Sequence, residues 1–180
     1  MKKLLLALPL TLFLAACGNN ATTDPQEIFE TAVTPQTLPG IWYTWNEDGN
    51  FEFFDFMTNV LVQAYIRPEN ESVGFIRVGG FHFHGADAHA HFNVGLFEDG
   101  AFVQIHDDFY FEPRLNGDGS RLRVEASTTG EVWYLNYLGN DPHELVHQVG
   151  HGVYFFESLE LDDLLDIAWA QATITGDDFD

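Results

Sequence analysis

The stretch Phe81–Phe92 concentrates side chains that bind metal ions, because it carries four of the chain's eight histidines: His82, His84, His89 and His91. Side chains alternate faces along a strand, so each H-x-H pair would share one face. Residues 85–88 suit a four-residue hairpin loop, which would place His84 opposite His89 and His82 opposite His91. Imidazole binds zinc, copper, iron and nickel well. The spacing therefore predicts a site for a divalent transition metal, with zinc as the first choice.

An alternative for the same stretch stays open. The two H-x-H pairs could form the solvent-exposed face of an amphipathic hairpin whose other face packs into the core through Phe81, Phe83, Ala90 and Phe92. If a metal binds, Asp87 and His106 could supplement the four histidines. Four protein ligands would close the coordination sphere, whereas three would leave a position for water and support an enzyme. A register slip of one residue would turn the pairs away from each other.

The segment Asp141–Gly152 contains three further histidines: His143, His147 and His151. The first two belong to an H-E-x-x-H motif, which on a helix holds zinc in metallopeptidases, with the Glu as general base. Here Asp141 is a good helix cap and Pro142 suits the first helical position, so we expect the helix to begin at the first histidine. Gly150 and Gly152 then end it after about two turns. We expect a surface helix first, with an accessory metal site or a zinc metallopeptidase as alternatives.

The N-terminus has the order of a secretory signal: a basic start at Lys2 and Lys3, an apolar run over Leu4–Leu14, then small residues before Cys17. The residues Leu14-Ala15-Ala16-Cys17 resemble the lipobox of bacterial lipoproteins. The resemblance implies a signal peptide of residues 1–16, cleavage before Cys17, and a lipid anchor that includes palmitate on that cysteine. The protein would then lie in the cell envelope. Gly18 favours the outer membrane if the cell is Gram-negative; otherwise the anchor would lie on the outer face of the cell membrane.

The chain is strongly acidic, with 28 acidic residues against seven Lys and Arg and a net charge of −21. Both lysines leave with the predicted signal peptide, so the mature chain would hold five arginines and a charge near −23 (5 − 28). Such a surface repels phosphate backbones and concentrates cations. This field argues against nucleic acid as a partner and favours a metal ion, although surface acid also serves solubility alone. The single cysteine leaves no intrachain disulfide.

From Ile41 onward, the pattern of residues is typical of short strands separated by turns. Aromatic and β-branched residues gather in nine segments: Ile41–Trp45, Phe51–Met57, Val60–Arg67, Val73–His84, His89–Phe97, Ala101–Ile105, Phe109–Phe111, Leu122–Glu125 and Val132–Leu138. Asp-Gly and Thr-Gly pairs mark several of the turns. Strands that follow one another without a helical crossover predict a mainly β, antiparallel domain over residues 38–180, closed as a barrel in preference to a sandwich.

We expect one helix before the first strand and one after the last strand. Residues 17–37 would hold the lipidated cysteine, a polar tether and a short helix over Pro25–Val33, with Asp24 as cap and Glu27 completing a capping box. After the last strand, Glu157–Ala172 places apolar residues at helical spacing: Leu161, Leu164, Leu165, Ala168 and Trp169. We expect this amphipathic helix to pack against the outside of the barrel.

The residues Gly40-Ile41-Trp42 at the start of the first strand resemble the G-x-W motif of lipocalins, and the strand meander with a following helix is similar to that calycin family. The resemblance implies an up-and-down barrel whose mouth or lumen binds a small ligand, here an apolar molecule among the 17 phenylalanines. Phe81-His82-Phe83-His84 is also locally similar to the α-carbonic anhydrases, where F-H-F-H supplies two zinc ligands from one strand. We therefore expect a membrane-anchored, non-catalytic metal binder, with a carrier of a small apolar ligand as the alternative.

Overall fold

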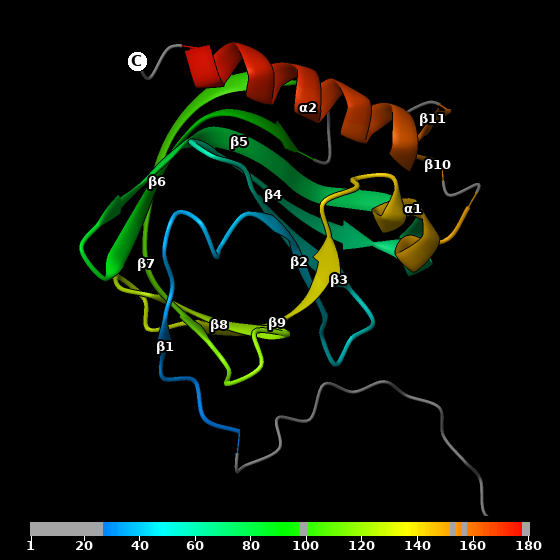
Figure 1. The fold of residues 1–180 in the computed structure, drawn as a ribbon. Coiled ribbons are helices and arrows are strands. Elements are labelled where there is room, and N and C mark those ends of the chain that lie inside the picture. The colour runs from blue at the N-terminus through cyan, green and yellow to red at the C-terminus, as the bar shows by residue number, and fades with distance from the viewer. Residues whose placement is uncertain (1–26, 98–100, 152–153, 156–157, 178–180) are drawn as a thin grey trace, which may run out of the picture.

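Eight consecutive strands close into an antiparallel barrel in a computed structural model that describes residues 27–97, 101–151, 154–155 and 158–177 (Figure 1). The predicted signal peptide and Cys17 lie outside these residues. The barrel strands are β2 (Gly40–Trp45), β3 (Phe51–Phe56), β4 (Val60–Arg67), β5 (Ser72–His84), β6 (Asp87–Phe97), β7 (Val103–Leu115), β8 (Arg121–Ala126) and β9 (Val132–Gly139). Each strand pairs with the next, and β2 pairs with β9 to close the barrel. The predicted barrel with an outer C-terminal helix is confirmed.

Alternation along the strands divides the apolar residues between the lumen and an outer layer. The lumen layer consists of buried side chains, many of them aromatic: Trp42, Phe54, Phe56, Leu61, Phe81, Phe92, Phe109, Phe111, Leu122, Val124 and Leu135. Neighbouring rings pack closely, and the centroids of Phe109 and Phe111 are 4.7 Å apart. These phenylalanines therefore fill the lumen with side chains instead of lining an empty apolar channel.

The helix α2 (Leu161–Asp177) covers an apolar patch on the outer face of the barrel (Figure 1). Its predicted apolar stripe is confirmed, because Leu161, Leu164, Leu165 and Ala168 are buried in one cluster with residues of β3, β4 and β5. The helix begins later than the predicted Glu157. The preceding residues Leu159–Glu160 form β11, which pairs with β10 (Tyr154–Phe155).

Asp55 on β3 is buried at the contact between α2 and the barrel. Trp169 Nε1 donates a hydrogen bond of 2.9 Å to Asp55 Oδ2, and the Trp169 ring stacks on Phe53 with 6.2 Å between centroids. Burial raises the pKa of Asp55 to about 6, although the bond from Trp169 opposes the rise. Asp55 is thus an ionisable group buried between α2 and the sheet.

The G-x-W residues have a packing role where β2 enters the barrel. Trp42 is buried, and its Nε1 donates a 2.9 Å hydrogen bond to the carbonyl oxygen of Leu38. Its ring contacts Tyr137, with centroids 4.9 Å apart. Gly40 has a φ of 128°, and a Cβ there would lie 2.6 Å from the Tyr137 ring, so glycine is required.

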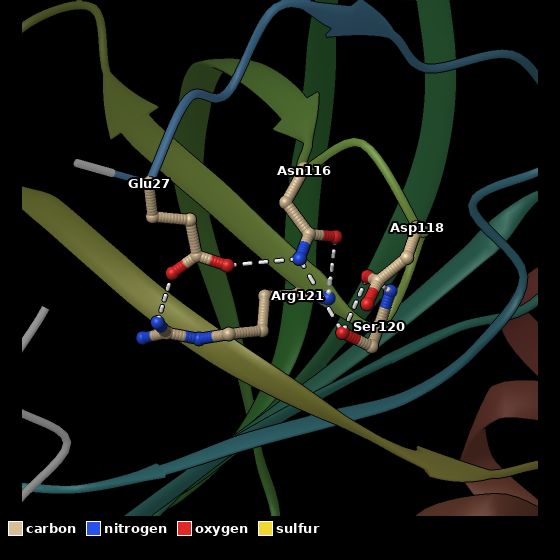
Figure 2. Close-up of polar contacts among 5 residues, drawn as sticks. All are labelled: Glu27, Asn116, Asp118, Ser120 and Arg121. Carbon is tan, nitrogen blue, oxygen red and sulfur yellow. Dashed lines mark hydrogen bonds and ion pairs between the residues drawn. The ribbon is translucent and has the colours of Figure 1, made fainter. Parts of the chain in front are cut away.

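The N-terminal segment lies along β7 and does not form the predicted helix over Pro25–Val33. The strand β1 (Thr31–Ala32) pairs antiparallel with Arg114 and Leu115. Glu27 forms an ion pair with Arg121 and accepts a 2.8 Å hydrogen bond from Asn116 Nδ2 (Figure 2). Because the barrel uses the Glu27 carboxylate, it does not complete a capping box, and the helix prediction is wrong for residues 27–33.

The remaining elements are short. A 3-10 turn, η1 (Pro68–Asn70), joins β4 to β5, and α1 (Glu144–Val149) follows β9. This helix begins one residue after the predicted start and ends at Gly150 as predicted. Within the described part of the chain, no helix combines the length and the apolar character needed to cross a bilayer.

Candidate metal centre

The β5–β6 hairpin carries its four histidines on one face, as predicted, but in a different register. This is the outer face, as in the alternative of an amphipathic hairpin. The turn has only two residues, Gly85-Ala86, so His84 lies opposite Asp87 and His82 lies opposite His89. Gly85 has a φ of 67°, as glycine has at the first central position of a tight hairpin turn. The predicted four-residue loop is therefore wrong. The register differs from the prediction by two residues, and an even shift keeps every side chain on its face.

Three of the four histidines form a compact set that could hold a metal ion: His82, His84 and His89, here called the histidine trio. One ligand atom from each lies within 4.8 Å of the other two. His82 Nε2 and His84 Nε2 are 2.8 Å apart, and the ring centroids of His82 and His89 are 5.0 Å apart. Ligand atoms on a tetrahedral zinc ion lie about 3.3 Å apart, given bonds of about 2.0–2.1 Å. Small side-chain rotations would therefore admit the ion.

The surroundings of His82 favour its neutral imidazole, the form that binds a metal. Partial burial and the nearby rings of His84 and His89 lower the pKa of His82. The His89 ring stacks on Tyr110 with 4.2 Å between centroids and 4° between planes, so its orientation is defined. His82 and His84 are exposed, which gives an ion direct access from solvent.

Asp108 on β7 joins the histidines, and the sequence prediction missed it. Its Oδ1 accepts hydrogen bonds from His89 Nε2 at 2.9 Å and from His91 Nδ1 at 2.8 Å. These bonds lower the pKa of Asp108, so the side chain is an ionised carboxylate. Carboxylates commonly orient metal-binding imidazoles from the outer shell. Asp108 is therefore placed to position His89 toward the trio.

Asp108 was missed because residues 106–108 were expected to form a loop between two short strands. They instead continue β7 as one strand, which pairs Asp108 with His91 of β6. The signal that could have found it is alternation. Phe109 and Phe111 point into the lumen, so His106, Asp108 and Tyr110 between and before them must point outward.

The other predicted ligands lie around the trio and not within it. His91 is opposite Gly80 and contacts Asp108, and its ring centroid is 5.9 Å from that of His106. Asp87 is the first residue of β6 and is exposed. We use the term histidine face for the six outward residues of β5, β6 and β7 that carry this chemistry: His82, His84, His89, His91, His106 and Asp108.

The second histidine cluster lies on the opposite side of the barrel, near α1 (Figure 1). His143 Nδ1 is 2.8 Å from Asp162 Oδ1 of α2, a contact that raises the pKa of His143. His147 Nδ1 and His151 Nε2 are 2.9 Å apart. Among the described residues, these three histidines do not form a group with metal-binding distances, and only the trio does. The geometry gives no support to a metallopeptidase centre.

A cavity of about 520 Å³, here called the mouth cavity, opens where the start of β5 faces the turn between β8 and β9. Its polar side chains form a chain of contacts. Glu52 accepts hydrogen bonds of 2.8 Å from Gln63 Nε2 and from Trp133 Nε1, and burial raises the pKa of Glu52. Arg77 Nε donates a 2.9 Å bond to Gln63 Oε1, and Arg77 pairs with Asp107. The cavity is therefore polar and charged.

No family model, curated protein or solved structure matches this chain. The closed antiparallel barrel is consistent with a calycin-like fold. The function is therefore argued from the histidine trio and its neighbours, together with the sequence of the N-terminus.

Proposed function

We propose that the protein is a membrane-anchored lipoprotein whose calycin-like barrel binds a divalent transition metal, with zinc as the first choice, through His82, His84 and His89. The observation that carries the proposal is the convergence of three imidazole nitrogens within 4.8 Å of one another. Three neutral imidazoles suit zinc and copper better than magnesium or calcium, which prefer oxygen ligands. The acidic surface adds a field that concentrates cations near the site.

The position of the trio favours capture and release of the ion over catalysis. His82 and His84 are exposed on the outer face, and neither the mouth cavity nor the groove beside Glu27 and Asn116 is lined by the trio. Substrates usually bind in a concave pocket next to the catalytic group. Three ligands leave an open coordination position, which by itself would support an enzyme. Because neither of these two pockets adjoins the trio, we infer that the open position serves exchange of the ion with solvent or with another chain.

Calorimetric titration of the purified full-length chain in detergent micelles tests the metal site. We expect wild type to bind zinc and His82→Ala/His84→Ala to lose at least 100-fold in affinity, more than the about 10–100-fold that outer-shell changes cost. The matched control is His147→Ala/His151→Ala, which removes two exposed histidines elsewhere and should leave binding unchanged. Equal binding by all three proteins, or a wild-type Kd weaker than about 1 mM, would refute the site.

The anchor is a separate part of the proposal and has its own test. The lipobox ending at Cys17 supports lipidation, since the modified residue is the chain's only cysteine. We expect wild type to fractionate with membranes and to label with a palmitate analogue, and we expect Cys17→Ser to lose both properties. A Cys17→Ser protein that fractionates and labels like wild type would contradict the anchor.

A second candidate function, ligand binding in the barrel, is favoured by the mouth cavity. The phenylalanines fill the lumen, so the available space is lined instead by Glu52, Arg77 and other polar groups. Such a site fits a small polar molecule better than the apolar ligand expected from the sequence. Native mass spectrometry of protein purified from its cells should show a bound organic mass that Arg77→Ala lacks. Only apo and metal-bound masses in wild type would eliminate this candidate.

A further inference from the structure

Next to the trio, the histidine face holds three more side chains of types that bind metals: His91, His106 and Asp108. Unlike in the trio, their ligand atoms do not all lie within 4.8 Å of one another, so these side chains must rotate to share an ion. The antiparallel pairing of β6 with β7 brings them together, because His91 and Asp108 are register partners. His106 lies two residues before Asp108 on the same strand and so shares its outward face. The ring centroids of His91 and His106 are 5.9 Å apart. Two imidazoles and one carboxylate therefore gather beside the first site.

A single oxygen atom of Asp108 connects the two sets. Oδ1 is 2.9 Å from His89 Nε2, which belongs to the trio, and 2.8 Å from His91 Nδ1, which does not. The Asp108 side chain is about half exposed and His91 one-third exposed, so both can change partners without disturbing the core. The imidazole proton that now bonds to Asp108 can move to the other ring nitrogen of the neutral ring.

Two divalent ions that lie close together need an anion between them. Two-metal sites in proteins hold their ions about 3.5–4 Å apart, and a carboxylate shared by both ions offsets the repulsion between them. The Asp108 carboxylate lies between the two histidine sets, since its Oδ1 contacts both His89 and His91, and a carboxylate has two oxygens with about four lone-pair sites. The second set requires side-chain rotations but no change of the backbone, because all six residues of the histidine face already point outward from adjacent strands.

We propose that the histidine face binds two divalent ions of the zinc type, the second held by His91, His106 and Asp108, with the Asp108 carboxylate shared between both ions. The inference rests on the proposed function, because Asp108 can bridge only if the trio holds the first ion. It adds a stoichiometry of two ions, three further ligands, and a carboxylate that both ions share.

Native mass spectrometry of the full chain in detergent, with zinc added in small excess, measures the stoichiometry. We expect two zinc ions on wild type and on the control His147→Ala/His151→Ala, whose histidines lie near α1. We expect one ion on His91→Ala/His106→Ala and one on Asp108→Asn. Circular dichroism spectra equal to wild type will show that these exposed substitutions leave the barrel folded.

Loading with Cu²⁺ in place of zinc measures whether the ions share a ligand. We expect the electron paramagnetic resonance signal per ion to fall when the second equivalent enters wild type, because bridged spins couple, and we expect no such fall in Asp108→Asn. One ion on wild type that His82→Ala/His84→Ala removes would overturn the second site and leave the proposed function intact. No bound ion would refute both. Two uncoupled ions on wild type would overturn the shared carboxylate. Loss of the second ion in His147→Ala/His151→Ala would overturn its location on the histidine face.

Discussion

His82 and His89 lie opposite each other across the β5–β6 pair, with 5.0 Å between their ring centroids. The two-residue turn Gly85-Ala86 sets this relationship, since turn length fixes which residues of a hairpin face each other. With the longer loop expected from the sequence, His82 would face His91 instead. The composition of the trio thus depends on the conformation of one glycine.

Substituting Gly85 tests the turn. A Cβ at Gly85 would meet no atom within 4 Å, so the cost of Gly85→Ala comes from its φ of 67° alone. We expect a loss of about 1–2 kcal/mol in the free energy of unfolding, the cost of a left-handed conformation for alanine. Gly85→Asn should lose less, because these turns accept asparagine. Urea denaturation measures both, and equal stability of Gly85→Ala and wild type would contradict the observed turn.

Asp55 should make stability depend on pH between about 4 and 6. Its pKa is raised from 3.8 to about 6, so the folded state holds the proton more tightly than the unfolded chain does. Stability is therefore highest while Asp55 is protonated and falls as pH rises through this window. The full effect is on the order of 3 kcal/mol at neutral pH, since one pKa unit corresponds to about 1.4 kcal/mol.

The variant Asp55→Asn isolates that effect, because asparagine keeps an oxygen that can accept the Trp169 hydrogen bond. We expect equal urea midpoints for wild type and variant near pH 4, and a more stable variant near pH 7. Asp163→Asn on the exposed side of α2 is the control and should show no such pH-dependent difference. Parallel stability curves for Asp55→Asn and wild type would show that the carboxylate is not buried as described.

We expect the contacts of Glu27 with Arg121 and Asn116 to hold the N-terminal segment against the barrel. Glu27→Ala leaves the partly buried Arg121 guanidinium without its ion pair (Figure 2). We expect a loss of about 1–3 kcal/mol in unfolding free energy, the cost of an unsatisfied buried polar group. Amide exchange at Thr31 and Ala32 of β1 should also become faster.

The control for Glu27 is Glu125→Ala, which removes the partner of Arg123 within one strand, on a more exposed pair. We expect a change of less than about 1 kcal/mol there, as for surface ion pairs in general. If the two variants lose equal stability and amide exchange in β1 is unchanged, the Glu27 contact does not hold the segment in place.

Features that depend on local pattern were predictable from the sequence. Alternation along the strands assigned Phe81, which is buried, and Phe83, which packs against the core, to the face opposite the histidines. The period of Leu161, Leu164 and Leu165 gave the buried face of α2. These patterns survive an error of two residues in register, which is why the histidines share a face although their partners were wrong.

Features that depend on pairing between distant segments were not predictable. Trp169 meets Asp55 from 114 positions away, and Asp108 joins His89 only because β7 lies beside β6. Residues 106–108 fell between two predicted strands. Alternation could have placed His106 and Asp108 on an outer face, but nothing local reveals that this face would meet a row of histidines. Glu27 was assigned to a helix cap for the same reason, because its partner Arg121 lies far along the chain.

Anomalous diffraction at the zinc absorption edge, from crystals of the zinc-loaded protein, tests the metal site most directly. We predict a peak about 2.0–2.1 Å from one ring nitrogen each of His82, His84 and His89. The peak should be absent from crystals of His82→Ala/His84→Ala grown under the same conditions. A peak at His147 and His151 with none on the histidine face, or no peak in wild type at zinc concentrations well above its measured Kd, would contradict the proposed function.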